Sequence, residues 1–338
     1  MAENVIDQIV ADLRQQATTL YPNRGELRNI RVVGHTPKSD HFIYDLVADF
    51  ANGGERMAVK VYRSGKTPQA ARNQATAEYT NLQRVYTAFS ENQLPGVPRP
   101  RGNFSALGAL VSEKIQGVPL QSMMMKAALL PGYDDNTSLR EAAGKAGEWL
   151  RNFHNLTGGP TQVFDAQQLL SELENLCLNC RGEGLDNEAI QMILTGAKNS
   201  LAKTRKAIPS SAVLKDFTPL SVVVTENGVG VSDYGKMSDH GISFNDAATF
   251  LASVEALEKY PFCNRNITGP VQESFLEAYG ASGADQAVLR VLKMRALLSM
   301  FAQGRGVKES GVRKKVMWAT VMKRFIQQAA SRSLAPAA

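Results

Sequence analysis

Near its N-terminus the chain changes from helical to strand-like spacing of apolar residues. Steps of three and four residues predict an amphipathic helix over residues 3–19, with an apolar face made of Val5, Ile6, Ile9, Val10 and Leu13. Short runs rich in β-branched and aromatic residues follow at 30–33, 42–50 and 57–62, separated by GHTPKSD and by the turn signal NGG. We expect a meander of antiparallel strands there.

A helix is predicted over 69–90, then strand-like stretches at 102–106 and 108–115. Beyond Gly117 the pattern is mostly helical, with clean apolar stripes from Leu139 to Phe153 and from Val288 to Phe301. We therefore expect an α+β protein of two domains: a small antiparallel-sheet lobe with one key helix at 1–116, and a larger helical lobe at 117–338.

One hairpin interrupts the helical part. Two valine-rich strands flank Asn227-Gly228, which is a strong signal for a two-residue turn. Antiparallel pairing about that turn would bring Ser221 and Asp233 to the same open end of the hairpin.

Composition narrows the class of protein. Of the 338 residues 43% are hydrophobic, yet no run approaches the ~20 apolar residues of a membrane-spanning helix. The first residues carry acids where a signal peptide is basic and then apolar, so we expect a cytoplasmic protein without a transmembrane segment. The pair Cys177 and Cys180 has no second pair or nearby histidine, which favours small apolar helix residues over a metal or redox site.

The net charge of +6 is spread along the chain except for one basic cluster near the C-terminus. No aromatic residues interleave with it, so nucleic acid is not an expected partner. The cluster has two interpretations: a solvated helix face, or peripheral contact with an anionic partner or membrane surface. It comprises Lys308, Arg313, Lys314, Lys315, Lys323 and Arg324.

Candidate chemistry begins with Lys60. Strand alternation puts Lys60 with Ala58 and Tyr62 on one face, and helical spacing puts Glu78 in the apolar stripe of the following helix. The two charges could form an ion pair that orients a phosphate-binding lysine, or both side chains could reach solvent at the edge of the packing.

Asp216 and Asp233 are the second candidate pair. The predicted hairpin brings both carboxylates just beyond one of its ends, where they could hold a divalent cation and accept a proton from a hydroxyl. The structural alternative is that one aspartate caps a turn and the other begins one.

Taken in order, these residues resemble a family. Lys60 in a strand, Glu78 on the next helix, LVSEKIQGVPL at 110–120, LKDFTPLSVVV and then VSDYGK follow the order of protein-kinase-like phosphotransferases. The aminoglycoside phosphotransferase branch is most similar: its catalytic segment reads HGDFTPGNVLV, followed by IDFG or IDWE. EWLRNFHNLTG and SFNDAATFLAS also resemble segments of that family.

The resemblance implies a bilobal protein-kinase-like fold, with ATP and magnesium as cofactors and a small hydroxylated molecule as acceptor. It assigns the α and β phosphates to Lys60, held by Glu78, and the catalytic base to Asp216. It assigns the metal to Asp233 and Ser221, and the adenine edge to backbone groups of Glu113 and Ile115. Acceptor recognition would fall to residues 121–137 and 161–208.

Three departures from the family pattern leave two functions open. Leu214 and Lys215 replace the His-Gly before Asp216, Ser221 replaces a metal-binding asparagine, and Gly34 stands alone where a glycine-rich loop covers the phosphates. The first hypothesis is an active small-molecule kinase. The second is a catalytically impaired pseudokinase that senses a nucleotide or binds a partner. The sequence identifies neither the acceptor nor the oligomeric state.

Overall fold

The computed structural model describes residues 2–63, 67–130, 136–181, 185–202, 204, 207–259, 263–303 and 324–331. The chain forms two compact units. Unit 1 comprises Met1–Gly117 and Thr225–Met237, and unit 2 comprises Val118–Val224 and Ser238–Ala338. Since Thr225–Met237 returns to unit 1, Asp233 belongs to the same unit as Lys60 and Glu78.

Unit 1 is built on a five-stranded antiparallel sheet of order β1-β2-β3-β5-β4. Its elements are α1 (Ala2–Leu20), β1 (Leu27–Pro37), β2 (His41–Phe50), β3 (Gly53–Tyr62), α2 (Pro68–Glu91), β4 (Pro100–Phe104), the 3-10 turn η1 (Ser105–Leu107), β5 (Ala109–Glu113) and β11 (Gly228–Val231).

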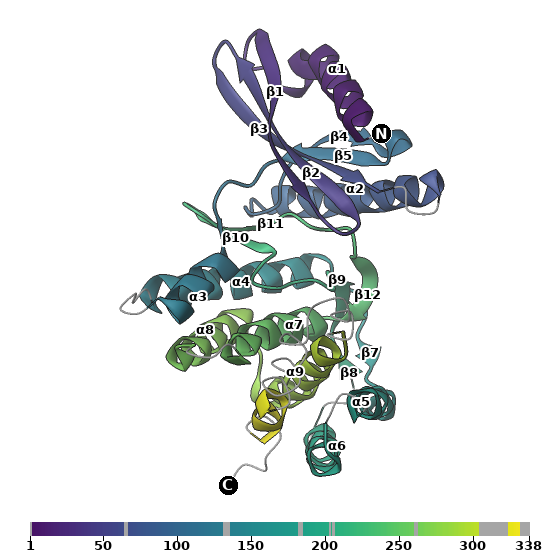
Figure 1. Ribbon diagram of the computed structural model, residues 1–338, viewed down its shortest axis with the longest axis vertical. Helices are drawn as coiled ribbons and strands as arrows, with labels where there is room; N and C mark the ends of the chain where they lie inside the picture. The colour runs from purple at the N-terminus through teal and green to yellow at the C-terminus, as the bar shows by residue number, and fades with distance from the viewer. Residues whose placement is uncertain are drawn as a thin grey trace, which may run out of the picture. The chain divides into compact units, whose positions relative to one another are not determined.

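The side chains on the two faces of β3 lie toward different helices. Met57, Val59 and Val61 belong to an apolar core that the buried face of α1 shares, and Figure 1 shows α1 alongside the sheet. Because successive side chains of a strand point to opposite faces, Lys60 and Tyr62 lie on the other face, where both reach α2. The buried stripe of α2 is the predicted one: Ala71, Ala75, Glu78, Leu82, Val85 and Phe89.

Unit 2 is mainly helical. It contains β6 (Val118–Pro119), α3 (Leu120–Leu129), α4 (Asn136–Leu156), β7 (Gln162–Val163), α5 (Ala166–Arg181), α6 (Asn187–Leu201), β8 (Ala207–Ile208), β9 (Ser210–Val213), β10 (Val222–Thr225), β12 (Ser238–Ile242), α7 (Phe244–Glu255), η2 (Ala256–Lys259), η3 (Arg265–Ile267), α8 (Thr268–Tyr279) and α9 (Gly283–Gln303). The strands β10 and β11 flank the Asn227-Gly228 turn, where a hairpin was predicted.

An aromatic core in unit 2 anchors the loop that carries Asp216. Phe217 is 1% exposed, and its ring centroid lies 5.9 Å from that of Trp149 and 5.6 Å from that of Phe250. Phe250 in turn stacks on Phe275 at 4.2 Å. Burial of the side chain directly after Asp216 therefore fixes this point of the loop on α4, α7 and α8.

The predicted apolar stripes of α4 and α9 are buried as expected, and Cys177 and Cys180 are buried in α5. None of the described helices has both the length and the apolar character needed to cross a membrane. The basic cluster at Lys308–Lys323 lies outside the described residues, so its partner stays a prediction; Arg324 begins the helical stretch 324–331.

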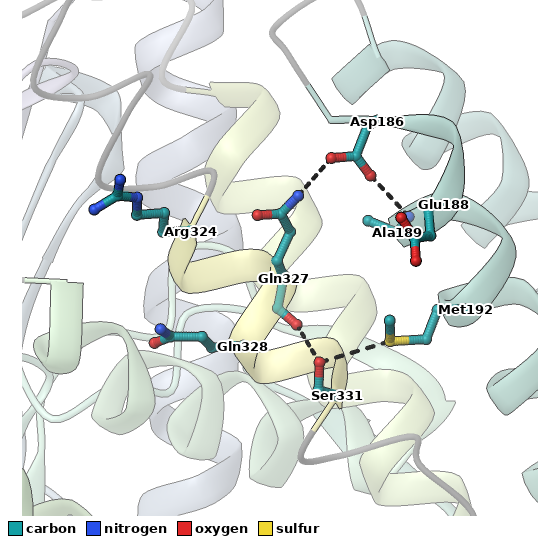
Figure 2. Close-up of a pocket in the computed structure, with 8 residues that line it drawn as sticks. All are labelled: Asp186, Glu188, Ala189, Met192, Arg324, Gln327, Gln328 and Ser331. Atoms are coloured by element: carbon teal, nitrogen blue, oxygen red, sulfur yellow. Dashed lines mark hydrogen bonds between the residues drawn. The ribbon is translucent and has the colours of Figure 1, made fainter.

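That helical stretch lies against the N-terminal part of α6. A hollow of about 210 Å³ lies between the two segments. Figure 2 shows its lining residues, among which the Asp186 carboxylate joins the two segments. One oxygen of Asp186 accepts from the backbone N–H of Ala189 at 2.9 Å, and the other accepts from the Gln327 side-chain amide at 2.5 Å. Ser331 donates to the Met192 sulfur at 3.7 Å. We assign this hollow a structural role, because Asp186 is committed to holding the segments together.

Candidate functional site

Lys60 lies between two carboxylates of unit 1. Its Nζ is 3.0 Å from Glu78 Oε1, 2.9 Å from Glu78 Oε2 and 3.0 Å from Asp233 Oδ1. Strand β3, helix α2 and the residues just after β11 each supply one member of this cluster. We call Lys60, Glu78 and Asp233 the charged cluster. The predicted ion pair of Lys60 and Glu78 is confirmed, and the alternative that both reach solvent separately is wrong.

Glu78 is fully surrounded by donors. Its side chain is 1% exposed, and besides Lys60 it accepts hydrogen bonds from the Tyr62 hydroxyl and, at 3.2 Å, from the backbone N–H of Tyr234. The carbonyl oxygen of Tyr234 accepts from Asn81 Nδ2 at 3.1 Å, which ties the same segment to α2 a second time. A buried carboxylate with this many donors is held in one orientation.

Gly235 allows this close approach. A Cβ at this position would lie 2.6 Å from the Tyr62 hydroxyl oxygen and 3.3 Å from Glu78 Oε2. Its backbone N–H also donates to Asp233 Oδ1 at 3.1 Å. Glycine therefore leaves the space that the Tyr62 hydroxyl occupies where the chain passes the charged cluster.

The charged cluster perturbs its own ionisation. Burial alone would lower the pKa of Lys60, but the carboxylates of Glu78 and Asp233 raise it above the ordinary value. Burial opposes ionisation of Asp233, but Lys60 and the Gly235 N–H hold the pKa of Asp233 below its ordinary value. Burial raises the pKa of Glu78, although Lys60 and the Tyr62 hydrogen bond act against this. Lys60 and Asp233 are thus kept charged near neutral pH.

A histidine and an aspartate lie beside the charged cluster. His41 is 7% exposed and pairs with Tyr62 across β2 and β3, with ring centroids 5.8 Å apart. Its Nδ1 lies 2.9 Å from Asp40 Oδ1. Burial first and Lys60 second lower the pKa of His41, so the ring is neutral at neutral pH.

Glu113 and Ile115 lie at the end of β5 and just beyond it. The Glu113 N–H donates to the Arg99 carbonyl at 2.8 Å, and its carboxylate accepts from the Arg101 guanidinium. The Ile115 side chain packs on Gly230, where a Cβ would lie 2.8 Å from its Cδ1. Because its N–H is committed to Arg99, Glu113 has only its backbone carbonyl left as a candidate for contact with adenine.

In unit 2 the loop after β9 carries Asp216 and Ser221. The Ser221 hydroxyl accepts from the Thr218 N–H at 2.9 Å and lies within donating distance of two carbonyls, that of Thr218 at 2.8 Å and that of Asp216 at 3.1 Å. Ser221 therefore closes the loop on itself, while the Asp216 side chain is exposed. The predicted convergence of Asp216 with Asp233 joins residues of different units and stays a prediction.

A fully buried carboxylate supports this loop from α7. Asp246 is 0% exposed and accepts from the N–H of Leu214 at 2.7 Å and from the N–H of Lys215 at 2.8 Å. His154 Nε2 lies 3.3 Å from the same carboxylate, and His154 Nδ1 lies 3.1 Å from the Tyr279 hydroxyl. The backbone just before Asp216 is thus held in place by a buried carboxylate.

A cavity of about 720 Å³ opens beside Asp216, between the loop, α5, α7 and α9. Its charged lining residues are Glu172, Arg295, Lys215 and Asp216. Neutral polar groups supply much of the remainder: Asn175, Asn179, Thr218, Asn245, Thr249 and Ser299. Its volume is within the range of small-molecule sites.

Sequence reasoning missed several of these residues. Tyr62 was recognisable from strand alternation as a neighbour of Lys60, but its bond to Glu78 was not. Asp246 lies in SFNDAATFLAS and His154 in EWLRNFHNLTG, where the sequence signal was a resemblance without a role for either residue. Arg295 carried no signal, because only the tertiary structure brings α9 to the Asp216 loop.

Comparison with known proteins shows likeness in structure alone. No protein-family model matches the chain, and no curated protein matches its sequence. A choline/ethanolamine kinase family protein from Mesorhizobium loti matches with a TM-score of 0.57 at 14% identity, over 98% of this chain and 98% of its own.

Two further solved structures carry ligands. A thermostable mutant of an aminoglycoside phosphotransferase, in ternary complex with AMP-PNP and hygromycin B, matches with a TM-score of 0.52 at 15% identity, over 92% of this chain and 97% of its own. A glucosamine kinase in complex with glucosamine, ADP and inorganic phosphate matches with a TM-score of 0.53 at 13% identity, over 91% and 95% of the two chains. These matches confirm the predicted protein-kinase-like fold of small-molecule kinases.

Proposed function

We propose that this protein transfers the γ-phosphate of ATP to a hydroxyl group of a small molecule, with magnesium as the metal cofactor. The observation that carries the proposal is the charged cluster, in which one lysine bridges a buried glutamate and an aspartate within 3.0 Å of each. A lysine held in this way is suited to neutralising phosphate oxygens.

Each residue of the proposed site has a distinct task. Lys60 binds the α and β phosphates in an orientation that Glu78 and Tyr62 maintain, and the adenine edge meets the Glu113 carbonyl and the backbone of Ile115. Asp216 orients the acceptor hydroxyl. The oxygen of the acceptor hydroxyl forms a bond to the γ-phosphorus as the bond from that phosphorus to the β,γ-bridging oxygen breaks. ADP is the leaving group, and the hydroxyl proton passes to the Asp216 carboxylate.

The residues present fit magnesium. Asp233 offers an ionised carboxylate of which one oxygen, Oδ1, is bonded to Lys60 and Gly235. Among the described residues no group of three or more acidic, histidine or cysteine side chains forms a metal cage. Mg²⁺ commonly binds one or two carboxylates together with substrate phosphates, and there it neutralises charge on the transferring group. Ser221 as a second ligand stays a prediction, because its hydroxyl is engaged inside its own loop.

The proposal is tested by measuring ADP release with Mg-ATP and a panel of hydroxylated metabolites. Asp216→Asn should lower kcat by about 10²- to 10⁴-fold, the usual contribution of a positioned base. The variant should unfold at the same temperature as the parent protein, because the Asp216 side chain is exposed. Equal rates in the two proteins would contradict the proposed mechanism. Binding of Mg-ATP without turnover of any acceptor would favour the impaired pseudokinase.

A further inference from the structure

The cavity beside Asp216 contains one cation that forms no ion pair with a described acid. Glu172 and Arg295 cancel each other, with Glu172 Oε2 2.8 Å from Arg295 Nη1, while Arg295 Nη2 donates to Asn245 Oδ1 at 2.7 Å. Asp216 is assigned to the acceptor hydroxyl under the proposed function. Lys215 is exposed and, among the described residues, has no ion-pair partner.

The backbone at Lys215 adopts a conformation that side chains disfavour. Its φ of 67° lies in the left-handed region, which costs a residue other than glycine roughly 1–2 kcal/mol. The Asp246 carboxylate maintains this conformation by accepting the N–H groups of Leu214 and Lys215. Backbone strain that buried groups enforce is concentrated at functional sites, so the strain at a lysine next to the candidate base points to a role for its side chain.

The other lining residues argue against a cationic acceptor. None of the described side chains that line the cavity is aromatic, whereas quaternary ammonium groups are recognised by aromatic cages. The lining holds as many cations as acids, two of each, so the cavity has no acidic surplus for a polycation. The amide of Asn175 suits a hydroxyl group, because an amide both donates and accepts.

We propose that the acceptor is a hydroxylated molecule that also carries an anionic group, a carboxylate or a phosphate, and that Lys215 binds this group while Asp216 faces the hydroxyl. The inference rests on the proposed function for the role of Asp216. The inference goes beyond the proposed function, because it assigns the chemical class of the acceptor and names Lys215 as the residue that selects the acceptor.

The test is equilibrium binding, by calorimetry without nucleotide, of two matched pairs of probes. D-gluconate is compared with sorbitol for the carboxylate, and glucose 6-phosphate with glucose for the phosphate. The proteins are the parent chain, Lys215→Met, Lys215→Gly and the control Lys145→Met. Lys145 lies on α4 outside the cavity and pairs with Glu141. Lys215→Gly retains a residue that accepts the left-handed backbone, so loss of binding in both Lys215 variants is not a folding defect.

In at least one pair, the parent protein and Lys145→Met should bind the anionic probe ~10-fold or more tightly than the neutral one, since a charge-assisted contact is the stronger kind. Both Lys215 variants should lose this preference. The proposal would be overturned if, in both pairs, the parent protein bound the two probes equally well or bound neither. It would also be overturned if the preference for the anionic probe survived in both Lys215 variants. Failure of the proposed function looks different: the anionic probe binds with the expected preference, but no γ-phosphate moves to any acceptor when Mg-ATP is added.

Discussion

The candidate groups of the two units are held in opposite ways. In unit 1 the charged cluster is fixed by side chains, with a Glu78 that is 1% exposed and a Lys60 that is 12% exposed. In unit 2 the Asp216 side chain is exposed, and the structure fixes the backbone of its loop through Asp246, Ser221 and Phe217. In unit 1 the side chains that we propose to bind the nucleotide also stabilise the fold. In unit 2 the proposed base, Asp216, and the groups that hold its loop are different residues. Substitutions in unit 1 should therefore damage the fold, whereas those at Asp216 and Lys215 should leave it intact.

Removing the lysine of the charged cluster is expected to have the largest effect on stability. Lys60→Met leaves Glu78 as a buried, uncompensated carboxylate, which costs about 3–5 kcal/mol. Hydrogen exchange read by mass spectrometry should show faster exchange in peptides of unit 1. Lys60→Met combined with Glu78→Gln should be less destabilised than the single variant, because no buried charge remains unpaired. A single variant as stable as Lys145→Met would contradict the account of unit 1.

Tyr62 and Gly235 give a sharper test of how the side chains are interlocked. Tyr62→Phe removes a donor from buried Glu78 and should cost about 1–3 kcal/mol of the free energy of unfolding. Gly235→Ala should cost a comparable amount, because its Cβ would lie 2.6 Å from the Tyr62 oxygen.

The double variant Tyr62→Phe/Gly235→Ala decides whether the two positions are coupled. Phenylalanine lacks the oxygen that the alanine would meet, so the combined loss should be smaller than the sum of the single losses by about 0.5–3 kcal/mol. Denaturant unfolding of the four proteins measures this difference. Strict additivity would show that the contact between Tyr62 and Gly235 is not what constrains this segment.

A milder substitution tests the backbone strain in unit 2. Lys215→Gly relieves a left-handed conformation that costs roughly 1–2 kcal/mol. The extra freedom of glycine in the unfolded chain offsets about 0.5–1 kcal/mol of this gain in stability. We expect a net gain in stability of about 0.5–1 kcal/mol. Lys215→Ala, which keeps the strain, serves as the matched control. A variant Lys215→Gly that is no more stable than Lys215→Ala would refute the strain.

A change of pH is the gentlest perturbation of unit 1, because it removes no atoms. The folded-state pKa of His41 is lowered by burial and by Lys60, so below the ordinary value of about 6.5 the unfolded chain binds a proton more readily than the folded one. The contribution of His41 to stability is therefore present above pH 6.5 and is lost as the pH falls below it. Unfolding measured between pH 8 and 5 should show this loss, and His41→Phe should reduce it. An unchanged pH dependence in His41→Phe would exclude the histidine as its source.

Periodicity predicted the charged cluster better than it predicted the rest of the site. Strand alternation around Lys60 and the stripe of α2 each have a short repeat, so both inward faces were recognisable from local sequence. The bond from Tyr62 to Glu78 was not predictable, because alternation determines the face of a residue and not the reach of its side chain. The left-handed backbone of Lys215 has no periodic signature either.

The lining of the cavity beside Asp216 overlaps the expected acceptor region only in part. The expected acceptor region, residues 121–137 and 161–208, includes α5 but neither α7 nor α9, which contribute Asn245 and Arg295. Three helices that are distant in sequence line the cavity, and only the folded structure brings them together. Tertiary packing of this kind has no local sequence pattern.

The most direct test of the nucleotide site is calorimetric titration of ATP into the parent protein and into Asp233→Asn, each with and without magnesium. The account predicts that the parent protein binds ATP more tightly with magnesium present, and that Asp233→Asn loses this metal dependence because the carboxylate that would hold the ion is gone. ATP binding that is absent in the parent protein, or that responds to magnesium equally in both proteins, would contradict the assignment of Lys60, Glu78 and Asp233 as a nucleotide site.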